Sequence, residues 1–435
     1  MIILAETLPP RAKLLARMFN AEPGEIPALM LSFGFFFCVL CAYYIVRPIR
    51  DETGVAYGSG FLGYAFTIIL VVMLAAVPLI GWLVANLARK LIVPIVYSFF
   101  IITLLMFWAL LRFEQSNIYV AGAFYIWVSV FSLFVVSLFW SFMTEVWQTA
   151  QAKGVYGIVS VGGTFGALTG PLLVQAFVHH IGVANLLLLS ALFLLMALGF
   201  YTALRRIVGD NGRTGGADKP DRASVLAGAI NVWKSPYLFR IAIWVLAGNF
   251  FGIFFTLEQA RILGAAFSDQ DSRLIMLARI ETGVSLLTII FEIFITGRLM
   301  QFIGVGRTIA IGPMCACVAL VVLAVAPGVA TIATIMVLMR AMDYGLSGPT
   351  MRVLYTIVDP RDKYRAQNFN DTVIYRGGNA ASAWLYNSVA KVLGVAGPVM
   401  TIIAVPLALC WVWLSIDLGL RHDKNASEKP VNPQS

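Results

Sequence analysis

Charged residues are scarce in this sequence. Aspartate, glutamate, lysine and arginine together make up 12% of the 435 residues, whereas apolar residues make up 60%. A soluble globular chain carries roughly a quarter of its residues as charges, because its surface must stay in water. The shortage of charge therefore excludes a soluble globular protein and indicates a chain that lies in a membrane.

Histidine and cysteine are also rare, which argues against most enzyme chemistry. The sequence has 3 histidines, and no group of His, Cys and carboxylate residues has the spacing of metal ligands. The 5 cysteines all fall in apolar stretches, so the CxxC formed by Cys38 and Cys41 predicts helix packing rather than a disulfide. No nucleophile lies near a base, and VGGTFG at 161–166 lacks the Lys-Ser/Thr of a phosphate loop. We expect no enzyme, no metal site and no cofactor.

Long apolar runs are what the sequence has in excess. About 20 apolar residues cross the hydrocarbon core of a bilayer, and lipid accepts only helices or closed barrels. The fold class that we expect is all-α membrane, with twelve transmembrane helices in two pseudo-symmetric six-helix bundles. The expected spans lie near 27–49, 61–86, 91–111, 118–143, 156–178, 183–204, 238–258, 274–297, 307–326, 329–350, 370–392 and 397–418.

The spans divide six and six around a polar stretch. We expect a cytoplasmic segment with an interfacial helix over 1–26, a first bundle over 27–204 and a cytoplasmic linker over 205–236. A second bundle over 237–418 and a disordered cytoplasmic tail over 419–435 follow.

The net charge of +9 orients the chain and implies nothing about nucleic acid. Most of the 31 lysines and arginines fall in segments on one predicted side, so both termini are expected in the cytoplasm. We expect a monomer in a bacterial inner membrane whose partners are the lipid bilayer and a small solute.

The two halves repeat each other. GWLVANLARK at 81–90 and GRLMQFIGVGR at 297–307 both resemble the short Gly-x-Leu…basic loop between helices 2 and 3 of the major facilitator superfamily. Internal repeats in a twelve-helix chain indicate a transporter whose two bundles rock about a central site. Within the fifth span, Gly162, Gly166 and Gly170 recur every four residues and predict a face that packs closely on a neighbouring helix.

Charges next to the first span are the first candidate site. Arg47, Arg50, Asp51 and Glu52 lie at its end, where a charge buried in the membrane costs about 2.5–3.5 kcal/mol. Two interpretations stay open. The four residues are either an interfacial cap with internal salt bridges or the wall of an anion-binding cavity, since arginine grips phosphate and carboxylate bidentately.

Charges in the second half are further candidates. Glu258 and Arg261 share a helix face, and the internal repeat predicts that they face the cluster around Arg47. Arg340 and Asp343 have the same spacing, so either a mutual salt bridge or a substrate contact is expected.

Two carboxylates of the eighth span, Glu281 and Glu292, are candidates for proton coupling. Glu292 has nothing basic within one turn, so it is either protonated and packed or a proton-coupling site.

Four short segments resemble the ATP/ADP translocases of plastids and intracellular bacteria. They are YYIVRPIRDE (43–52), the run 138–170, FTLEQAR (255–261) and DKYRAQNFNDTVIYRGGN (362–379). The run 138–170 is similar to that family's helices 4 and 5 and contains Glu145 and Lys153. The resemblance implies the major facilitator fold and a cavity lined by cations.

We therefore expect a secondary transporter of a nucleotide or other phosphorylated or organic anion, working by alternating access, with exchange as one open mode. The expected substrate-binding residues are Arg47, Arg50, Asp51, Glu258, Arg261 and Arg376. The expected gating or coupling residues are Lys153, Glu145, Glu292, Arg340 and Asp343.

Two alternatives remain. One is a proton-coupled transporter of an unrelated small solute, with the proton on Glu292, Glu281 or Asp343, because desolvation favours a neutral buried carboxyl. The other is a membrane receptor or assembly partner that keeps the fold without transporting.

Overall fold

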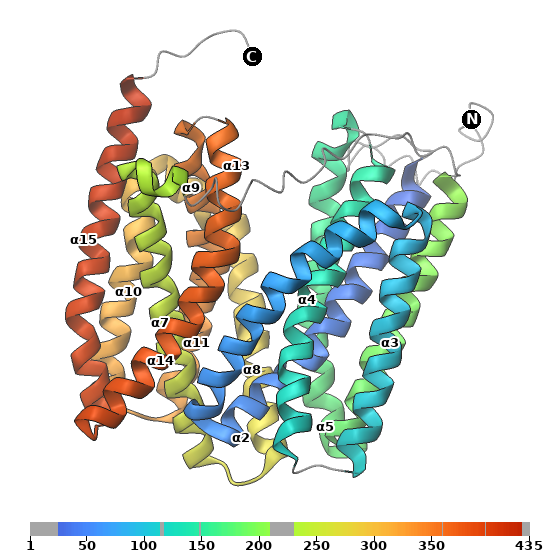
Figure 1. The fold of residues 1–435 in the computed structure, drawn as a ribbon, viewed down its shortest axis with the longest axis horizontal. Coiled ribbons are helices and arrows are strands. Elements are labelled where there is room, and N and C mark those ends of the chain that lie inside the picture. Colours follow the sequence, from blue (N-terminus) through green and yellow to red (C-terminus); the bar gives the residue numbers. More distant parts are fainter. Residues whose placement is uncertain are drawn as a thin grey trace. The chain divides into compact units, whose positions relative to one another are not determined.

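Helices make up nearly all of the described chain in the computed structural model (Figure 1). The structure describes residues 25–113, 117–147, 149–208, 230–358, 360–395 and 397–428. Within these ranges, side chains are not described at 77–78, 80–85, 89, 149–154, 360–361, 364 and 423–428.

The elements follow one another with short connections. The α-helices are α2 (Ile26–Asn86), α3 (Arg89–Phe113), α4 (Ile118–Val146), α5 (Thr149–Val208), α7 (Pro236–Ala266), α8 (Gln270–Ile290), α9 (Thr296–Ile303), α10 (Val305–Val325), α11 (Val329–Met342), α12 (Gly348–Leu354), α13 (Pro360–Phe369), α14 (Tyr375–Leu393) and α15 (Pro398–Glu428). Three π-helical turns interrupt this series, η3 (Phe291–Ile295), η4 (Asp343–Ser347) and η6 (Asn370–Ile374), and η5 (Tyr355–Ile357) is a short 3₁₀ turn.

Two of these helices each contain two of the expected spans. α2 breaks at Gly58, with φ 80°, and α5 breaks at Gly182, with φ 78°; Figure 1 shows the chain turning at both places. Only glycine adopts this left-handed backbone without steric cost. Gly58 and Gly182 therefore end one span and begin the next.

The described residues contain 9 helices long and apolar enough to cross a membrane. The expected span at 370–392 corresponds to η6 and α14 and is not among the nine. Two element ends also differ from expectation. α2 continues past residue 49 to Gly58 although Pro48 lies within it, and α15 continues to Glu428, past the expected start of the tail at 419.

The chain forms two compact units that do not coincide with the halves of the sequence. The first consists of Met1–Thr53, Ala75–Lys219 and Leu274–Thr282, and the second of Gly54–Leu74, Pro220–Arg273 and Gly283–Ser435. Each unit thus takes one short helical segment from the opposite half of the chain.

Hydrogen bonds hold these exchanged segments in place. In the second unit, Asn387 donates from Nδ2 to the carbonyl oxygen of Ser59 at 2.9 Å, and the Trp384 indole donates to Thr67 Oγ1 at 2.8 Å. In the first unit, Gln175 Nε2 donates to Thr282 Oγ1 at 2.9 Å.

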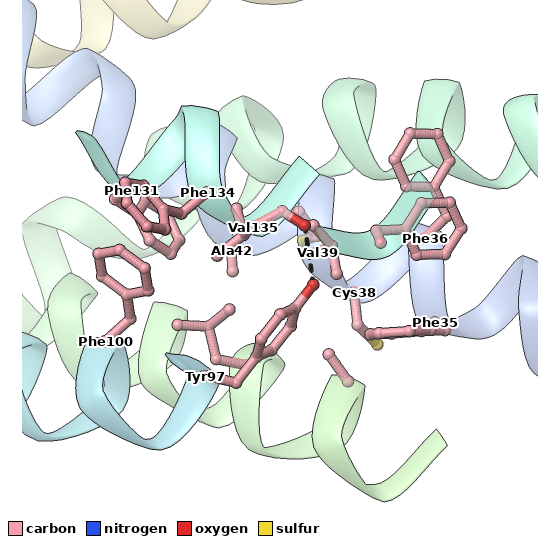
Figure 2. Close-up of a cluster of buried hydrophobic side chains, with 14 of the residues drawn as sticks. Phe35, Phe36, Cys38, Val39, Ala42, Tyr97, Phe100, Phe131, Phe134 and Val135 are labelled. Carbon is pink, nitrogen blue, oxygen red and sulfur yellow. Dashed lines mark hydrogen bonds between the residues drawn. The ribbon is translucent and has the colours of Figure 1, made fainter. Parts of the chain in front are cut away.

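The core of the first unit is built from aromatic side chains of α2, α3 and α4. Phe35 and Phe139 pack edge to face with ring centroids 5.0 Å apart, and Phe36 stacks on Phe139 at 4.2 Å. The buried Tyr97 hydroxyl donates to the carbonyl oxygen of Val135 at 2.9 Å (Figure 2). Because lipid offers no hydrophobic driving force between helices, such shape-matched contacts and hydrogen bonds hold the helices together.

The glycine-rich face of α5 packs directly on α2, as its four-residue spacing predicts. A Cβ atom on Gly166 would overlap the carbonyl oxygen of Phe37, and one on Gly162 would lie 2.6 Å from that of Phe33. Gly170 meets Tyr44 Cβ at 2.8 Å in the same way. The prediction of a close-packing face is confirmed, and these glycines bring the two backbones into contact.

In the second unit, α7, α10 and α15 pack closely. Gly306 of α10 and Gly419 of α15 touch so closely that a Cβ on Gly306 would lie 2.7 Å from Gly419 Cα. Trp244 of α7 stabilises the same region, because its indole nitrogen donates to Ser415 Oγ at 2.8 Å.

Replacing Gly166 by alanine should destabilise the protein, because the new methyl group would collide with the backbone of α2. Overpacking of this kind costs about 1–3 kcal/mol. Gly199→Ala is the matched control, since Gly199 lies in the same helix α5 and a Cβ atom added there would meet nothing within 4 Å. The control should be neutral or stabilising by roughly 1 kcal/mol. Thermal unfolding in detergent measures both; equal midpoints for the two variants would contradict the packing described.

Candidate functional site

Arg47 lies in the first half of α2, against the rings of two tyrosines. Its guanidinium carbon is 5.9 Å from the ring centroid of Tyr43 and 5.4 Å from that of Tyr44, and Nη1 donates to the Tyr44 hydroxyl at 3.4 Å. The two tyrosines precede Arg47 by four and three residues, so the helix itself places them on the same face. The rings stabilise the cation through their π faces.

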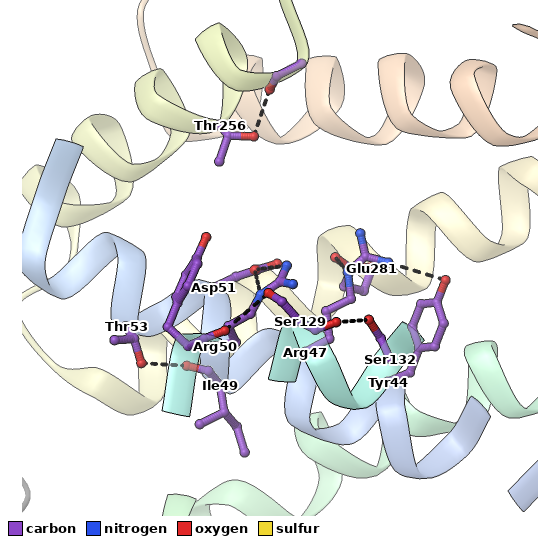
Figure 3. A network of polar contacts seen from close by, with 12 residues as sticks. Tyr44, Arg47, Ile49, Arg50, Asp51, Thr53, Ser129, Ser132, Thr256 and Glu281 are labelled. Atoms are coloured by element: carbon purple, nitrogen blue, oxygen red, sulfur yellow. Dashed lines mark hydrogen bonds and ion pairs between the residues drawn. The ribbon is translucent and has the colours of Figure 1, made fainter. Parts of the chain in front are cut away.

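Glu281 of α8 pairs with Arg47 inside the first unit. Arg47 Nε lies 3.3 Å from Glu281 Oε1 (Figure 3). Arg47 is 8% exposed and Glu281 is 1% exposed, so the pair is buried. Two charges removed from water in this way are tolerated only because each neutralises the other.

Arg50, one helical turn further along α2, forms a second pair. Its Nε and Nη2 donate to Oδ1 of Asp51 at 2.9 and 2.6 Å, and its guanidinium carbon lies 5.4 Å from the ring centroid of Tyr125 on α4. Both side chains keep some contact with solvent, with 18% of Arg50 and 22% of Asp51 exposed. We call Arg47, Arg50, Asp51 and Glu281 the arginine cluster.

Both arginines of the arginine cluster bind a negatively charged side chain. In each pair a carboxylate oxygen lies against a guanidinium group, which is the arrangement in which arginine binds the carboxylate or phosphate of a ligand. Glu52 is buried on the same helix at 3% exposure. The charges expected at the end of the first span therefore lie within α2, and Arg47 and Glu52 are both buried.

Glu258 organises a second cluster, within the second unit. Its carboxylate is completely buried and accepts two hydrogen bonds on Oε2 from Arg261, at 2.9 and 2.6 Å. Its other oxygen, Oε1, accepts a 2.6 Å hydrogen bond from the hydroxyl of Tyr386 on α14. The structure thus brings Glu258 together with Arg261, three residues along α7, and with a tyrosine from another helix.

Arg261 is the accessible member of this second cluster, with 37% of its side chain exposed. Gly397, with φ 64°, lies against its guanidinium, and a Cβ there would be 3.1 Å from Nη2. A glycine at this position leaves room for the arginine and adopts a backbone that other residues avoid.

The π-helical turns of the second unit each carry an acidic residue. Glu292 is the second residue of η3, Asp343 the first of η4 and Asp371 the second of η6. Single π-helical turns are rare and are found frequently at functional sites. Glu292 and Asp343 are both exposed, so Glu292 is not packed in the interior.

Side chains of neighbouring helices support two of these turns. Thr296 Oγ1 donates to the carbonyl oxygen of Gly345 in η4 at 2.5 Å. Asn249 of α7 donates to the carbonyl oxygens of Ile374 and Tyr375 at 3.4 and 3.3 Å, at the end of η6. Each bond satisfies a carbonyl that the irregular turn would leave poorly paired.

The remaining candidates are spread over both units. Arg376 is partly buried on α14 beside the ring of Tyr375, at 5.5 Å from its centroid. Arg340 is partly buried in the last turn of α11, and Glu145 is partly buried near the end of α4. Lys153 lies in α5, but its side chain is outside the part of the chain that the structure describes.

Five residues of these clusters were not among the predicted substrate-binding residues. From the sequence, Glu281 is expected only as a proton carrier. Glu281 and Arg47 nevertheless carry opposite charges on two different apolar spans, and this opposition is a sequence signal for their pairing. Tyr43 and Tyr44 could have been found from their helical spacing to Arg47. The sequence carries no comparable signal for Tyr125 and Tyr386, because ordinary aromatic positions in apolar helices look the same.

The fold is that of the major facilitator transporters. No family model matches the sequence, and no curated protein sequence matches it. Solved structures do match. The peptide transporter PepTSo of the POT family has a TM-score of 0.64 at 13% identity, covering 93% of this chain and 99% of its own.

Two further neighbours are also transporters by name. The nucleoside transporter NupG, solved as a point mutant, matches with a TM-score of 0.59 at 14% identity, covering 92% of this chain and 99% of its own. A bacterial homologue of the human lysosomal transporter Spinster matches with a TM-score of 0.58 at 13% identity, covering 94% and 98%. Identities this low establish the shared fold alone.

Removing one member of the buried pair should cost more stability than removing both. Arg47→Met or Glu281→Leu alone leaves a buried charge without its counter-charge, which costs roughly 3–5 kcal/mol, whereas the double variant should recover most of that loss. Asp417→Asn is the control, because Asp417 pairs with Arg240 and Arg421 at a partly exposed site where a bridge contributes about 0–1 kcal/mol. Thermal unfolding of the four variants measures this; additive losses in the double variant would contradict the pairing.

Tyr386→Phe should weaken the second cluster by about 1.5–3 kcal/mol, the usual contribution of a hydrogen bond to a charged group. The variant keeps the ring but removes the hydroxyl that donates to the buried Glu258. Tyr64→Phe serves as control, since Tyr64 is exposed and packs its ring edge to face with Trp384 at 5.0 Å. Equal unfolding midpoints for Tyr386→Phe and Tyr64→Phe would show that the hydroxyl does not stabilise Glu258.

Proposed function

We propose that this protein is a secondary transporter of a nucleotide or another phosphorylated or organic anion, working by alternating access in a bacterial inner membrane with both termini in the cytoplasm. The fold supports transport, because structures with this architecture carry solutes as varied as nucleosides and peptides by name. The protein acts as a monomer and needs no nucleic acid partner.

The arginine cluster is the observation on which the proposal rests. Two arginines stand one helical turn apart on an apolar helix, and each holds a carboxylate. Buried ion pairs add little stability compared with apolar residues of the same size, so stability alone does not account for them. Charged residues within membrane spans usually mark a substrate or ion pathway.

We assign a role in the proposed transport to each of these residues. Arg47 and Arg50 bind the anion, and Glu281 and Asp51 occupy the guanidinium groups while substrate is absent. Arg261 and Arg376 are the proposed substrate-binding cations of the second unit, and the Arg261 side chain is 37% exposed. In an exchanger, these cations would prevent the empty protein from changing state until an anion neutralises them.

The resemblance to the ATP/ADP translocases favours nucleotide exchange within this class. Arg47, Arg50 and Asp51 align with that family's charged residues at the end of helix 1, and Glu258 aligns with its glutamate in helix 7. The family-level assignment is part of the proposal, as is the division into two bundles joined by the linker at 205–236.

A second candidate is a proton-coupled transporter of an unrelated small solute. The exposed carboxylates of Glu292 and Asp343 on π-helical turns favour it, because such turns recur at functional sites. A nucleotide or other anion need not bind in that case.

A thermal-shift screen separates the two candidates. A ligand at a hundredfold excess over its dissociation constant stabilises the folded state by about 2.7 kcal/mol. The screen compares ATP, ADP, glucose 6-phosphate and succinate with neutral and cationic solutes. We expect stabilisation by one or more of the anions; stabilisation by neutral or cationic solutes only would favour the second candidate.

Arg50→Ala should weaken the binding of the stabilising anion by roughly 10- to 100-fold, because it removes charge-assisted hydrogen bonds worth about 1.5–3 kcal/mol. Arg421→Ala is the control, as it removes an exposed arginine of the Asp417 pair instead. The difference in unfolding midpoint with and without anion measures the effect in each variant. An unchanged ligand-induced shift in folded Arg50→Ala would remove Arg50 from the site.

A further inference from the structure

In the proposed function, an anionic solute competes with Glu281 for the guanidinium of Arg47. What happens to the Glu281 carboxylate when the solute binds is a separate question. Arg47 Nε, one of the donors that an anion would need, lies 3.3 Å from Glu281 Oε1. Nη1 donates to the Tyr44 hydroxyl, and the rings of Tyr43 and Tyr44, which belong to the same helix, lie against the guanidinium. An anion that binds at Nε therefore displaces Glu281 from it.

We propose that anion binding at Arg47 is coupled to the uptake of one proton by Glu281, so that the solute and H⁺ bind together. This inference rests on the proposed function, since it needs an anionic solute at Arg47. It names Glu281, rather than the exposed carboxylates of the π-helical turns, as the proton site.

Burial of Glu281 is the first reason. At 1% exposure its carboxylate has no access to bulk water, and an ionised carboxylate that has lost its cation in such a place is strongly disfavoured. A proton on either oxygen removes that cost. Asp51, the other acid in the cluster, is 22% exposed, so water can solvate it when Arg50 turns to a ligand.

The charged groups around Glu281 are the second reason. On α2 the charged groups that act on it are Arg47, Asp51 and Arg50. On α5 the neighbouring contact is neutral, an amide of Gln175 on Thr282, and on α4 the Tyr125 ring faces Arg50 rather than Glu281. Arg50, the other cation of the arginine cluster, is itself held by Asp51.

The step balances in charge. Before binding, one guanidinium cation and one carboxylate anion neutralise each other. After binding, the same guanidinium neutralises one negative charge of the solute, and Glu281 carries a proton taken from the water as a neutral carboxylic acid. No covalent bond forms except the O–H bond of the acid.

A proton fits this position better than a metal cation. Among the residues that the structure describes, no three His, Cys, Asp or Glu side chains lie together as a metal site would need. A proton requires only one carboxylate oxygen, which Glu281 supplies.

The experiment measures binding of ADP, glucose 6-phosphate and succinate, one at a time, by calorimetry on the purified full-length protein between pH 7.5 and 9. Phosphate groups are fully ionised in this range, since their second pKa is about 6, so the ligands do not titrate. Binding that takes up one proton should weaken about tenfold per pH unit, and the binding enthalpy should change with the ionisation enthalpy of the buffer.

Glu281→Gln tests the residue. Its amide cannot take up a proton, so binding should become independent of pH and, at pH 9, tighter than in the wild type. Asp417→Asn is the control and should keep the tenfold dependence. Should Glu281→Gln fail to fold, proton uptake by the wild type from the buffer series still decides whether coupling exists.

The outcomes are distinct. Anion binding with no proton uptake, or a pH dependence that persists in Glu281→Gln, overturns the coupling but leaves the proposed function in place. A dependence on sodium in place of pH overturns it too. If none of the three anions binds, the proposed function itself fails, and the coupling fails with it.

Discussion

A charge placed among apolar helices needs an opposite charge within reach, and the arrangement of the first unit depends on this constraint. Arg47 of α2 finds its counter-charge on α8, far along the chain. That pairing requires the segment Leu274–Thr282 of α8 to lie against α2 within the first unit, where Gln175 of α5 also holds it through Thr282. α5 is in turn held against α2 by the glycines that precede Gln175. The ion pair, the amide contact and the glycine face thus make α2, α5 and α8 a single packed group.

The second unit meets the same constraint by a different route. Glu258 is neutralised by Arg261 on its own helix, so the pair forms as soon as α7 does, and Tyr386 adds a donor from α14. A local pair of this kind does not depend on where other helices lie, whereas the pair of Arg47 and Glu281 exists only when α8 is in place. The ion pair of the first unit therefore depends on the position of a second helix, whereas the ion pair of Glu258 and Arg261 in the second unit does not.

Much of this architecture is readable in the sequence because hydropathy and glycine spacing act locally. The apolar runs mark the helices, and the spacing of Gly162 and Gly166 predicts the face that meets α2. Pairing is different. From the sequence, several carboxylates are equally possible partners of Arg47, and the internal repeat favours Glu258. In the structure Arg47 pairs with Glu281. That choice depends on helix positions that no short stretch of sequence encodes. The continuation of α2 to Gly58 is a further difference: four charges suggest an interface, yet the helix runs through them and through Pro48, which lies among them.

The π-helical turn η6 has a consequence for how this chain is compared with others. A π-helical hydrogen bond spans five residues where an α-helical one spans four, so a single such turn accommodates one extra residue without unwinding the helix. η6 ends at Ile374, and Arg376 follows in the first turn of α14. An alignment that assumes a regular helix through this turn puts Arg376 on the wrong face by one residue, about 100° around the axis. Homologous cations on this helix should therefore be matched by their position after the turn, and a relative that lacks the extra residue would carry the equivalent charge one place earlier in its sequence.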